Sequence, residues 1–498
     1  MEGGVRLSSD TGTALVGLDV GTTGVKALAL SPDGDVLATA TRGYALSTPR
    51  PGWAEQDPGD WLRAAESALA EVSAGREIAG IGLSGQMHGL VVLDETGTVI
   101  RPAILWNDQR TAVECAEIEE RIGLDRLIGL TGNRALPGFT APKLLWLRRH
   151  EPEAYARIAL VMLPKDYVRL GLTGAWAIDA SDASGTLLLD VARRDWSAEV
   201  VDALELEREW LPPVLESPEV SGRVTKGRSD AVSPGIPVAA GAGDQPAAAV
   251  GVGATRPGTM SVVLGTSGVV LAPLPAYAHD AEARVHAFCH ARPGTWQAMG
   301  VMLSAAGSLQ WLHDTIAKDV PFDALVAEAE TWPPGAEGLL FLPYLAGERT
   351  PHADPDARGA FVGLELRHDR GALVRAVLEG VAFGLADSLD LLRALGVDAA
   401  TARVSGGGAR SRLWLRIVAS VLGVPLELTE SEEGSALGAA LLGGVAGGVF
   451  AGVDDAVARC VRVTSAVEPD PAWHEAYRAA HERYRALYPA LRAARVPG

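Results

Sequence analysis

The sequence predicts an α/β protein built from two related domains, each with a mixed β-sheet covered by helices. The chain has 498 residues, more than a single hydrophobic core usually supports. A hairpin turn of Gly-Thr-Thr-Gly at residues 21–24 returns as Gly-Thr-Ser-Gly at residues 265–268, 244 positions further on. In each half a later apolar strand also runs into a glycine-containing turn, at residues 78–86 and 402–408. Two such repeats at matching places indicate related halves.

Turn residues divide the start of each half into short strands. Residues 14–20 and 25–30 are apolar runs on either side of the first turn, and residues 36–40 follow a second turn, which predicts an antiparallel meander. Further strands are expected at residues 237–240, 260–264 and 269–272, and helices, from apolar residues at helical spacing, at residues 60–71, 139–149, 371–395 and 412–422. A cluster of Gly, Thr and Pro at residues 251–257 predicts the domain boundary.

These elements predict an N-terminal domain over residues 14–252, a C-terminal domain over residues 253–450 and a helical tail over residues 451–498, in which residues 469–498 form an amphipathic helix. Residues 434–453 carry no charge and are numerous enough to cross a bilayer. They are mostly Gly and Ala, however, and two aspartates follow them. A buried helix that ends in a glycine-rich turn is therefore the better interpretation.

Charge and cysteine content exclude several classes of function. The formal net charge is −18 and no run of Lys or Arg forms a basic stripe, so neither nucleic acid nor an anionic membrane is an expected partner. Three widely spaced cysteines show no metal-ligand or disulfide pattern, which fits a reducing compartment. Residues 1–13 lack an apolar signal core, so a cytoplasmic protein is expected.

The first hairpin turn carries residues suited to phosphate and metal. Asp19 ends a buried strand, where a carboxylate can hold a hydrated magnesium ion. Glycines allow close approach of an anion, and the hydroxyls of Thr22 and Thr23 can donate to phosphate oxygens. An ordinary hairpin turn is the alternative interpretation. The second turn of the same kind, with Thr266, favours phosphate handling.

A second carboxylate, Asp244, lies in the turn Gly-Ala-Gly-Asp-Gln-Pro at residues 241–246, directly after a predicted strand. It can accept a proton from a substrate hydroxyl, or it can be the N-cap of the Ala-rich helix that follows. The two roles are compatible and both stay open.

The loop at residues 405–410, with Gly407 and Gly408, suits the packing of a nucleobase or ribose against backbone, or simply the entry to a helix. It lacks the ending of a P-loop.

Two polar segments suit a sugar. In the segment Gln-Met-His-Gly at residues 86–89, His88 can bond a polyol or be a satisfied core histidine, and the motif alone favours the core role. The cluster Trp-Asn-Asp-Gln-Arg at residues 106–110 combines an aromatic face with paired donors and acceptors, the mixture that a sugar site needs. A helix start with a surface salt bridge is the alternative for this cluster.

From about residue 14 to residue 450, the chain resembles the FGGY family of carbohydrate kinases. The most specific match begins Pro-Tyr-Leu-Ala-Gly-Glu-Arg-Thr-Pro-His at residue 343 and continues to residue 359. Together with the segments at residues 86–89 and 106–110, it is similar to the family members that act on D-xylulose. Glycerol kinases carry an Arg-Glu pair where this chain has Met87 and His88.

The resemblance implies two actin-like (ribonuclease-H-like) ATPase domains flanking a central cleft, with ATP and Mg²⁺ as cofactors and a small sugar as substrate. Asp244 would be the general base, and Asp19 would help to hold the metal together with Asp244. The implied sugar-binding residues are Gln86, Met87, His88, Asp108 and Gln245. The residues that would serve ATP are Thr22, Thr23, Thr266, Gly307, Gln310, Gly407 and Gly408.

The reaction that this implies is transfer of the γ-phosphoryl group of ATP to the 5-hydroxyl of D-xylulose. Gln245 is typical of glycerol kinases, and ribulose, gluconate and glycerol therefore stay as alternative substrates. Arg416 and Ser420 stand where the family often has Gln and Asp. An actin-like nucleotide switch is a further alternative, but it would not need the cluster at residues 106–110 or the pair Met87 and His88. Assembly as a homodimer stays open.

Overall fold

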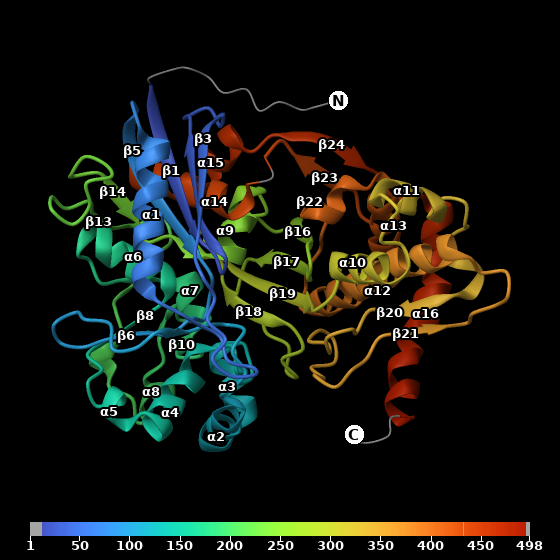
Figure 1. The fold of residues 1–498 in the computed structure, drawn as a ribbon, viewed down its shortest axis with the longest axis horizontal. Coiled ribbons are helices and arrows are strands. Elements are labelled where there is room, and N and C mark those ends of the chain that lie inside the picture. The colour runs from blue at the N-terminus through green and yellow to red at the C-terminus, as the bar shows by residue number, and fades with distance from the viewer. Residues whose placement is uncertain (1–11, 432, 495–498) are drawn as a thin grey trace.

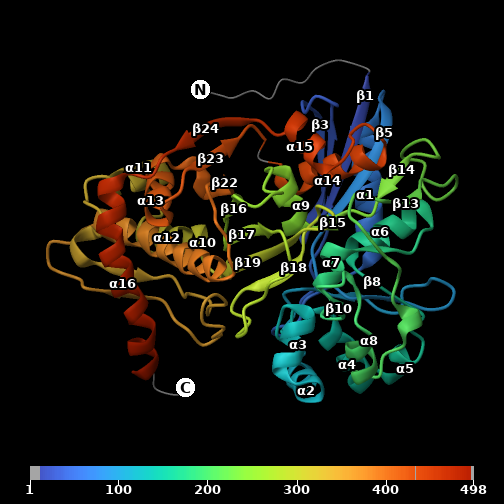
Figure 2. The same ribbon diagram turned by 180° about the vertical axis from the view of Figure 1, so that it is seen from behind.

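The computed structural model describes residues 12–494 apart from residue 432. Two sheets of seven strands each form the centres of two α/β domains, which lie side by side in the two opposite views of Figures 1 and 2. The predicted class, two mixed sheets covered by helices, is confirmed.

The first sheet has the strand order β13-β14-β5-β1-β2-β3, with the short strand β15 beside β5. The central strand β1 pairs antiparallel with β2 and parallel with β5, so the predicted meander is confirmed. The strands are β1 (Thr13–Val20), β2 (Gly24–Leu30), β3 (Val36–Gly43), β5 (Glu77–Gly85), β13 (Val220–Arg223), β14 (Pro237–Ala239) and β15 (Ala242–Gly243). Helices α1 (Pro58–Ser73) and α6 (Pro164–Thr173) pack against it.

The second sheet repeats this arrangement in the order β18-β19-β17-β16-β22-β23-β24. Its strand β16 pairs antiparallel with β17 and parallel with β22, as β1 does with β2 and β5. The strands are β16 (Thr259–Leu264), β17 (Gly268–Leu274), β18 (His286–Cys289), β19 (Trp296–Met302), β22 (Thr401–Ser405), β23 (Leu426–Thr429) and β24 (Val463–Val467). The domain also contains α10 (Ala306–Ile316), α11 (Phe322–Ala329), β20 (Leu340–Leu342), β21 (Ala360–Val362), α12 (Arg370–Ala394), η3 (Gly407–Arg410) and α13 (Arg412–Leu422), whereas α15 (Val453–Cys460) packs beside the first sheet. The predicted relation between the halves is thus visible in strand order and direction.

Two helices between the sheets pack backbone against backbone. Helix α14 (Gly434–Ala446) lies on the first sheet and against α9 (Asp244–Gly251). A Cβ added to Gly82 would stand 1.7 Å from the carbonyl oxygen of Ala439, so only glycine allows this approach. The uncharged stretch at residues 434–453 therefore begins as a buried helix, as predicted. No helix in the described part of the chain is long and apolar enough to span a membrane.

An extension of the first domain lies below its sheet in Figure 1. It has its own hydrophobic core, which strand β18 of the second sheet joins through Phe288. Its elements are β6 (Val91–Leu93), β7 (Ala103–Ile104), α2 (Ala112–Ile122), α3 (Leu124–Thr131), α4 (Thr140–His150), α5 (Pro152–Tyr155), β8 (Leu160–Met162), β9 (Ile178–Asp179), α7 (Ala180–Ser184), β10 (Leu189–Asp190), β11 (Asp195–Trp196), α8 (Ala198–Ala203) and β12 (Val214–Leu215). The short strand β4 (Glu55–Gln56) pairs with β7.

The predicted amphipathic tail helix is α16 (Pro471–Ala493), which packs on α13. Arg416 of α13 pairs with Asp470 at 2.5 Å, and the amide of Asp470 donates to Oγ of Ser420 at 3.0 Å. His474 bonds the carbonyl oxygen of Ser420 at 2.7 Å. The two residues that depart from the family pattern, Arg416 and Ser420, therefore hold the tail helix in place.

Candidate active site

Three parallel strands of the first sheet end together and place two carboxylates at one edge. Asp19 of β1 lies opposite Ser84 of β5, and Ser84 lies opposite Ala242 of β15. Asp244 follows β15 directly. The carboxyl ends of parallel strands are where α/β folds bind their ligands. At this edge Asp19 is close enough for its charge to act on Asp244.

The environment raises the pKa of both carboxyl groups. Burial raises the pKa of Asp244 to about 7, the charge of Asp19 adds to this effect, and hydrogen bonds from the adjacent Gln245 oppose it. Burial also raises the pKa of Asp19 to about 6. The hydroxyl of Ser84 and the charge of Lys26 have the opposite, smaller effect on this pKa. A carboxyl group that titrates near neutral pH is suited to accept a proton from a substrate.

Asp244 does not cap the helix that follows it, so that predicted role is wrong. Helix α9 begins with Asp244 itself, and its N-cap is Gly243, which has no side chain to bond the helix amides. An acidic residue in the first turn is still favoured by the helix dipole. The carboxylate of Asp244 therefore stays available to a ligand, and its neighbour Gln245 lies beside it on the same turn.

The two carboxylates fit a magnesium ion. Oδ1 of Asp19 is buried and accepts no hydrogen bond from the described residues, as expected of an oxygen that receives a ligand. Within residues 12–431 and 433–494, no group of three or more His, Cys, Asp or Glu side chains could hold a metal. Mg²⁺ is usually held by one or two carboxylates with water and substrate phosphates, so Asp19 and Asp244 suit it without a third protein ligand.

A buried amide network holds the first hairpin turn. Gln86 is 1% exposed, accepts from Oγ1 of Thr22 at 3.3 Å and donates to the carbonyl of Gly21 at 3.4 Å. It also donates to Gln56 at 3.1 Å, and Gln56 donates to the carbonyl of Thr22 at 2.7 Å. The side chain of Gln86, expected to bind sugar, is thus occupied in shaping the turn. Thr23 is exposed at the tip.

Met87 and His88 lie beside the turn that carries Asp244. A Cβ added to Gly243 would stand 2.8 Å from the sulfur of Met87, so Met87 packs against the residue before Asp244. Nδ1 of His88 lies 2.7 Å from the carbonyl oxygen of Gly185, which only accepts, so the proton is on Nδ1 and Nε2 is an acceptor. Burial lowers the pKa of His88 to about 3, which keeps the ring neutral.

His88 is held in place from several sides. Its φ is 72°, in the left-handed region that few non-glycine residues adopt. Its carbonyl oxygen accepts from Nζ of Lys143 at 2.8 Å and from Oγ1 of Thr140 at 3.1 Å. Its ring packs edge-on against Phe139 with centroids 4.8 Å apart, and Phe288 of the second sheet lies at 6.2 Å. No motif in the sequence marks Lys143 or Phe288 as part of this site.

The side chain of Asp108, also expected to bind sugar, is bonded to the protein. It is 0% exposed and accepts from the amide of Ala54 at 2.7 Å. Arg110 donates to both of its oxygens, at 2.8 and 2.6 Å. The cluster does contain a salt bridge, but the alternative interpretation is wrong in its place, because the pair is buried and helix α2 begins only at Ala112. Trp106, 41% exposed, bonds Oγ1 of Thr22 at 3.0 Å and faces the first turn.

Glycine-rich segments of the second domain converge on the turn that contains Thr266. A Cβ added to Gly307, in the first turn of α10, would stand 2.9 Å from the carbonyl oxygen of Thr266. One added to Gly406 would stand 2.7 Å from the carbonyl of Leu264, just before that turn. At Gly407, by contrast, no described atom lies within 4 Å of an added Cβ, which leaves room for a flat ligand group.

The remaining residues expected to serve ATP lie around the same loop. Gly408 packs with Trp414, to which an added Cβ would approach within 3.0 Å. Gln310 is exposed one turn after Gly307 on α10 and bonds Asp314 at 2.9 Å. A groove of about 450 Å³ runs beside the loop, and its walls include Ser405, Gly406, Arg412, Thr429 and Ser431.

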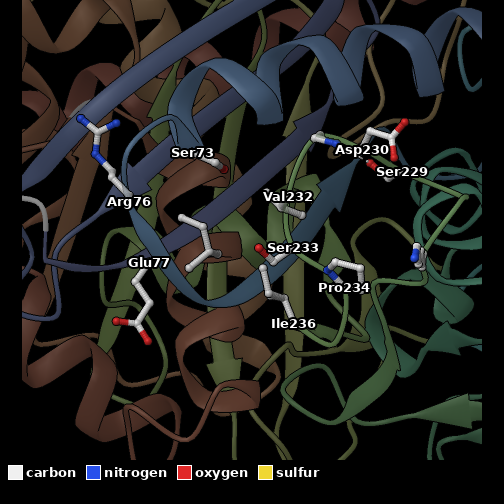
Figure 3. Close-up of a pocket in the computed structure, with 12 residues that line it drawn as sticks. Ser73, Arg76, Glu77, Ser229, Asp230, Val232, Ser233, Pro234 and Ile236 are labelled. Atoms are coloured by element: carbon white, nitrogen blue, oxygen red, sulfur yellow. Dashed lines mark hydrogen bonds between the residues drawn. The ribbon is translucent and has the colours of Figure 1, made fainter.

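A larger groove lies elsewhere in the described part of the chain. It measures about 950 Å³ and is lined by side chains such as Arg76, Glu77, Asp230 and Ile236, as Figure 3 shows. Glu77 begins β5, whereas Ser84, opposite Asp19, lies near its other end. At about 3.3 Å per residue the two ends are roughly 20 Å apart. This groove is therefore separate from the two carboxylates.

The sheet topology and the paired carboxylates define the class of the protein: two α/β domains with related mixed sheets, and two carboxylates at the carboxyl ends of neighbouring strands. Residues 14–251 match the N-terminal domain, and residues 260–447 the C-terminal domain, of the FGGY family of carbohydrate kinases. The chain belongs to this family.

Relatives and solved structures agree with this assignment. The chain is 46% identical over 436 residues to the xylulose kinase of Escherichia coli K12, covering 86% of this chain and 89% of that protein. It is 37% identical over 483 residues to the xylulose kinase of Bacillus subtilis 168, covering 95% and 96%. A solved structure described as a xyloylose kinase from Brucella ovis superimposes with a TM-score of 0.91 at 43% identity, covering 97% of this chain and 100% of that one.

Proposed function

We propose that the chain is an ATP-dependent xylulokinase, which transfers the γ-phosphoryl group of ATP to the 5-hydroxyl of D-xylulose. The observation that carries this proposal is that Asp19 and Asp244 share one sheet edge, beside Met87 and His88. The choice of sugar is supported by the relatives named xylulose kinase, at up to 46% identity.

In the proposed reaction Asp244 takes the proton from the attacking hydroxyl. Its raised pKa gives it proton affinity without leaving it permanently protonated. The acceptor Nε2 of neutral His88 receives a hydrogen bond from a sugar hydroxyl, and Met87 covers the apolar edge of the carbon chain. These contacts orient the 5-hydroxyl toward the phosphate, and orientation is the main source of catalysis in phosphoryl transfer.

The nucleotide is placed by the second domain. The amides of the turn at Thr266 and the start of α10 face the phosphates, and the loop at Gly407 takes the nucleoside. When bound, Mg²⁺ neutralises charge on the transferred phosphoryl group. Asp19, whose Oδ1 has no hydrogen-bond partner among the described residues, is the principal group of this chain for that cation, with Asp244 as its neighbour.

A substrate panel tests the proposal. ADP release is measured with ATP, Mg²⁺ and D-xylulose, D-ribulose, D-gluconate or glycerol, with Asp244→Asn as the negative control. The gluconate arm is included because a gluconate kinase from Lactobacillus acidophilus superimposes with a TM-score of 0.91 at 26% identity. We expect the highest kcat/KM with D-xylulose. A higher value for another compound would reassign the substrate, and sugar-independent ADP release or ATP-dependent filaments would favour a nucleotide switch.

A further inference from the structure

Behind the turn that carries Asp244 lies a cluster of ionisable side chains, all of them at most 2% exposed. Nζ of Lys165 lies 2.7 Å from Asp166, 2.7 Å from Asp179 and 3.0 Å from Asp182. Arg169 pairs with Asp166 at 2.8 Å. Helix α6 supplies the two cations and Asp166, while Asp179 and Asp182 come from the start of α7.

Such a cluster is costly for stability alone. Moving a charged group from water into the interior costs several kcal/mol, and apolar replacements of buried ion pairs are often neutral or stabilising. The cluster holds two cations and three carboxyl groups, and burial raises the pKa of Asp182 well above its usual range, which favours its neutral form.

The cluster is joined by hydrogen bonds to the turn that carries Asp244. Strand β14 ends at Ala239 and β15 begins at Ala242, and Gly241 has a φ of 80°, so residues 240 and 241 are irregular backbone whose polar atoms need partners in the interior. Nη2 of Arg169 donates to the carbonyl oxygen of Ala240. The amide of Gly243, the residue before Asp244, donates to Oγ of Ser181 at 3.3 Å.

Ser181 is itself held by the cluster. Its hydroxyl donates to Asp179, which also accepts the amides of Ser181 at 2.9 Å and Asp182 at 3.1 Å at the start of α7. Asp179 forms an ion pair in turn with Lys165. The stem of Lys165 packs at the end of β5, where a Cβ added to Gly85 would stand 3.1 Å from it. A continuous buried chain therefore runs from α6 to the backbone beside Asp244.

We propose that Ser181, oriented by Asp179 and Lys165, is a positioning residue for the catalytic carboxylate. By accepting the amide of Gly243 it sets the direction in which the chain enters α9, and so the place of the Asp244 carboxylate relative to the attacking hydroxyl. This inference rests on the proposed role of Asp244 as general base. A displacement of the reacting groups by about 1 Å can cost up to roughly 100-fold in rate, so one bond here is enough to matter.

The test compares Ser181→Ala with Ser184→Ala. Ser184 is a matched control because it lies on the same helix and its hydroxyl also accepts a buried backbone amide, that of Cys289 at 3.0 Å. For Ser181→Ala we expect kcat to fall about 10-fold with the KM for ATP unchanged, and a melting temperature close to that of Ser184→Ala. Ser184→Ala is expected to keep kcat within about twofold of the wild type. Equal kcat values for the two variants would overturn the inference.

A double variant separates positioning from general damage. If Ser181 acts only by placing Asp244, then Ser181→Ala added to Asp244→Asn causes no further loss of kcat, because coupled residues are not additive. A full additional 10-fold loss would mean that Ser181 acts elsewhere. Should Ser181→Ala fail to fold, Ser181→Cys, which keeps the shape but weakens the bond, takes its place.

The same assays keep this inference distinct from the proposed function. They use whichever sugar the wild-type protein phosphorylates fastest, so a substrate other than D-xylulose would refute the substrate assignment alone. A wild-type protein that phosphorylates no sugar would refute the proposed function itself. Asp244→Asn with wild-type turnover would remove Asp244 from the mechanism, and with it this inference. Wild-type turnover of Ser181→Ala alongside an inactive Asp244→Asn would refute only the positioning role.

Discussion

The substitution Asp244→Asn is predicted to stabilise the ligand-free protein while it abolishes most of its activity. Asparagine keeps the shape of aspartate but carries no charge and cannot accept the substrate proton. The carboxylate of Asp244 is held at a buried strand end, close to the charge of Asp19, and this arrangement penalises its ionised form. Removing that penalty should make the folded state more stable when no cation or nucleotide compensates for it.

The size of the effect follows from the pKa, which is about 7 in the folded protein against an ordinary 3.8. The folded state binds this proton more tightly, so stability falls as pH rises from 3.8 to about 7 and is level above that. A difference of about 3 units at 1.36 kcal/mol per unit gives an upper bound of about 4 kcal/mol. Because Asp244 is partly exposed and therefore screened by water, we expect about 2 kcal/mol at pH 8.

Thermal unfolding without Mg²⁺ and ATP measures the gain in stability of Asp244→Asn, and steady-state ADP release measures its loss of activity. At about pH 8 the melting temperature of Asp244→Asn should exceed that of the wild type, and at about pH 5 the gain should shrink to less than half. The kcat should fall by roughly 10² to 10⁴, the usual contribution of a general base. Asp398→Asn, at an exposed position, is the control and should leave both unchanged. A melting temperature of Asp244→Asn that is equal to or lower than that of the wild type at pH 8 would refute the electrostatic reasoning.

Three further predictions concern the sugar, the nucleotide and the cation. His88→Ala should raise the KM for the sugar at least 10-fold and leave the KM for ATP unchanged. In the wild-type protein the KM for the sugar should show no histidine titration between about pH 5 and 8, because the pKa of His88 is about 3. Gly407→Val should raise the KM for ATP and leave the melting temperature unchanged, since the new side chain enters open space. Gly406→Ala should lower the melting temperature, because Gly406 has a φ of 91° and an added Cβ would lie 2.7 Å from a carbonyl group. Chelation of divalent cations should stop ADP release, and added Mg²⁺ should restore it; turnover that persists in the chelator would contradict the role given to Asp19.

Local sequence patterns were sufficient for the main elements of the fold. The strands at β1, β2 and β16 and the helices α1, α12 and α13 lie within a few residues of their expected places, because runs of apolar residues and glycine turns act over short distances. The same patterns predicted that the halves are related. They did not predict that α14, which lies between β23 and β24 of the second sheet in the chain, packs on the first sheet, because that contact depends on glycines far apart in sequence.

The sequence by itself determined the family, and it predicted the two carboxylates and the glycine loops as site residues, since each of these features is carried by a few adjacent residues. Only the tertiary structure decided which polar groups are free for a ligand. Gln86 and Asp108 were expected to contact sugar, yet their oxygens are bonded within the protein, whereas Lys143 and Ser181 carry no motif and still hold the backbone of the site. The physical reason is that a hydrogen-bond partner is set by side-chain direction and strand register, which join residues far apart in the chain.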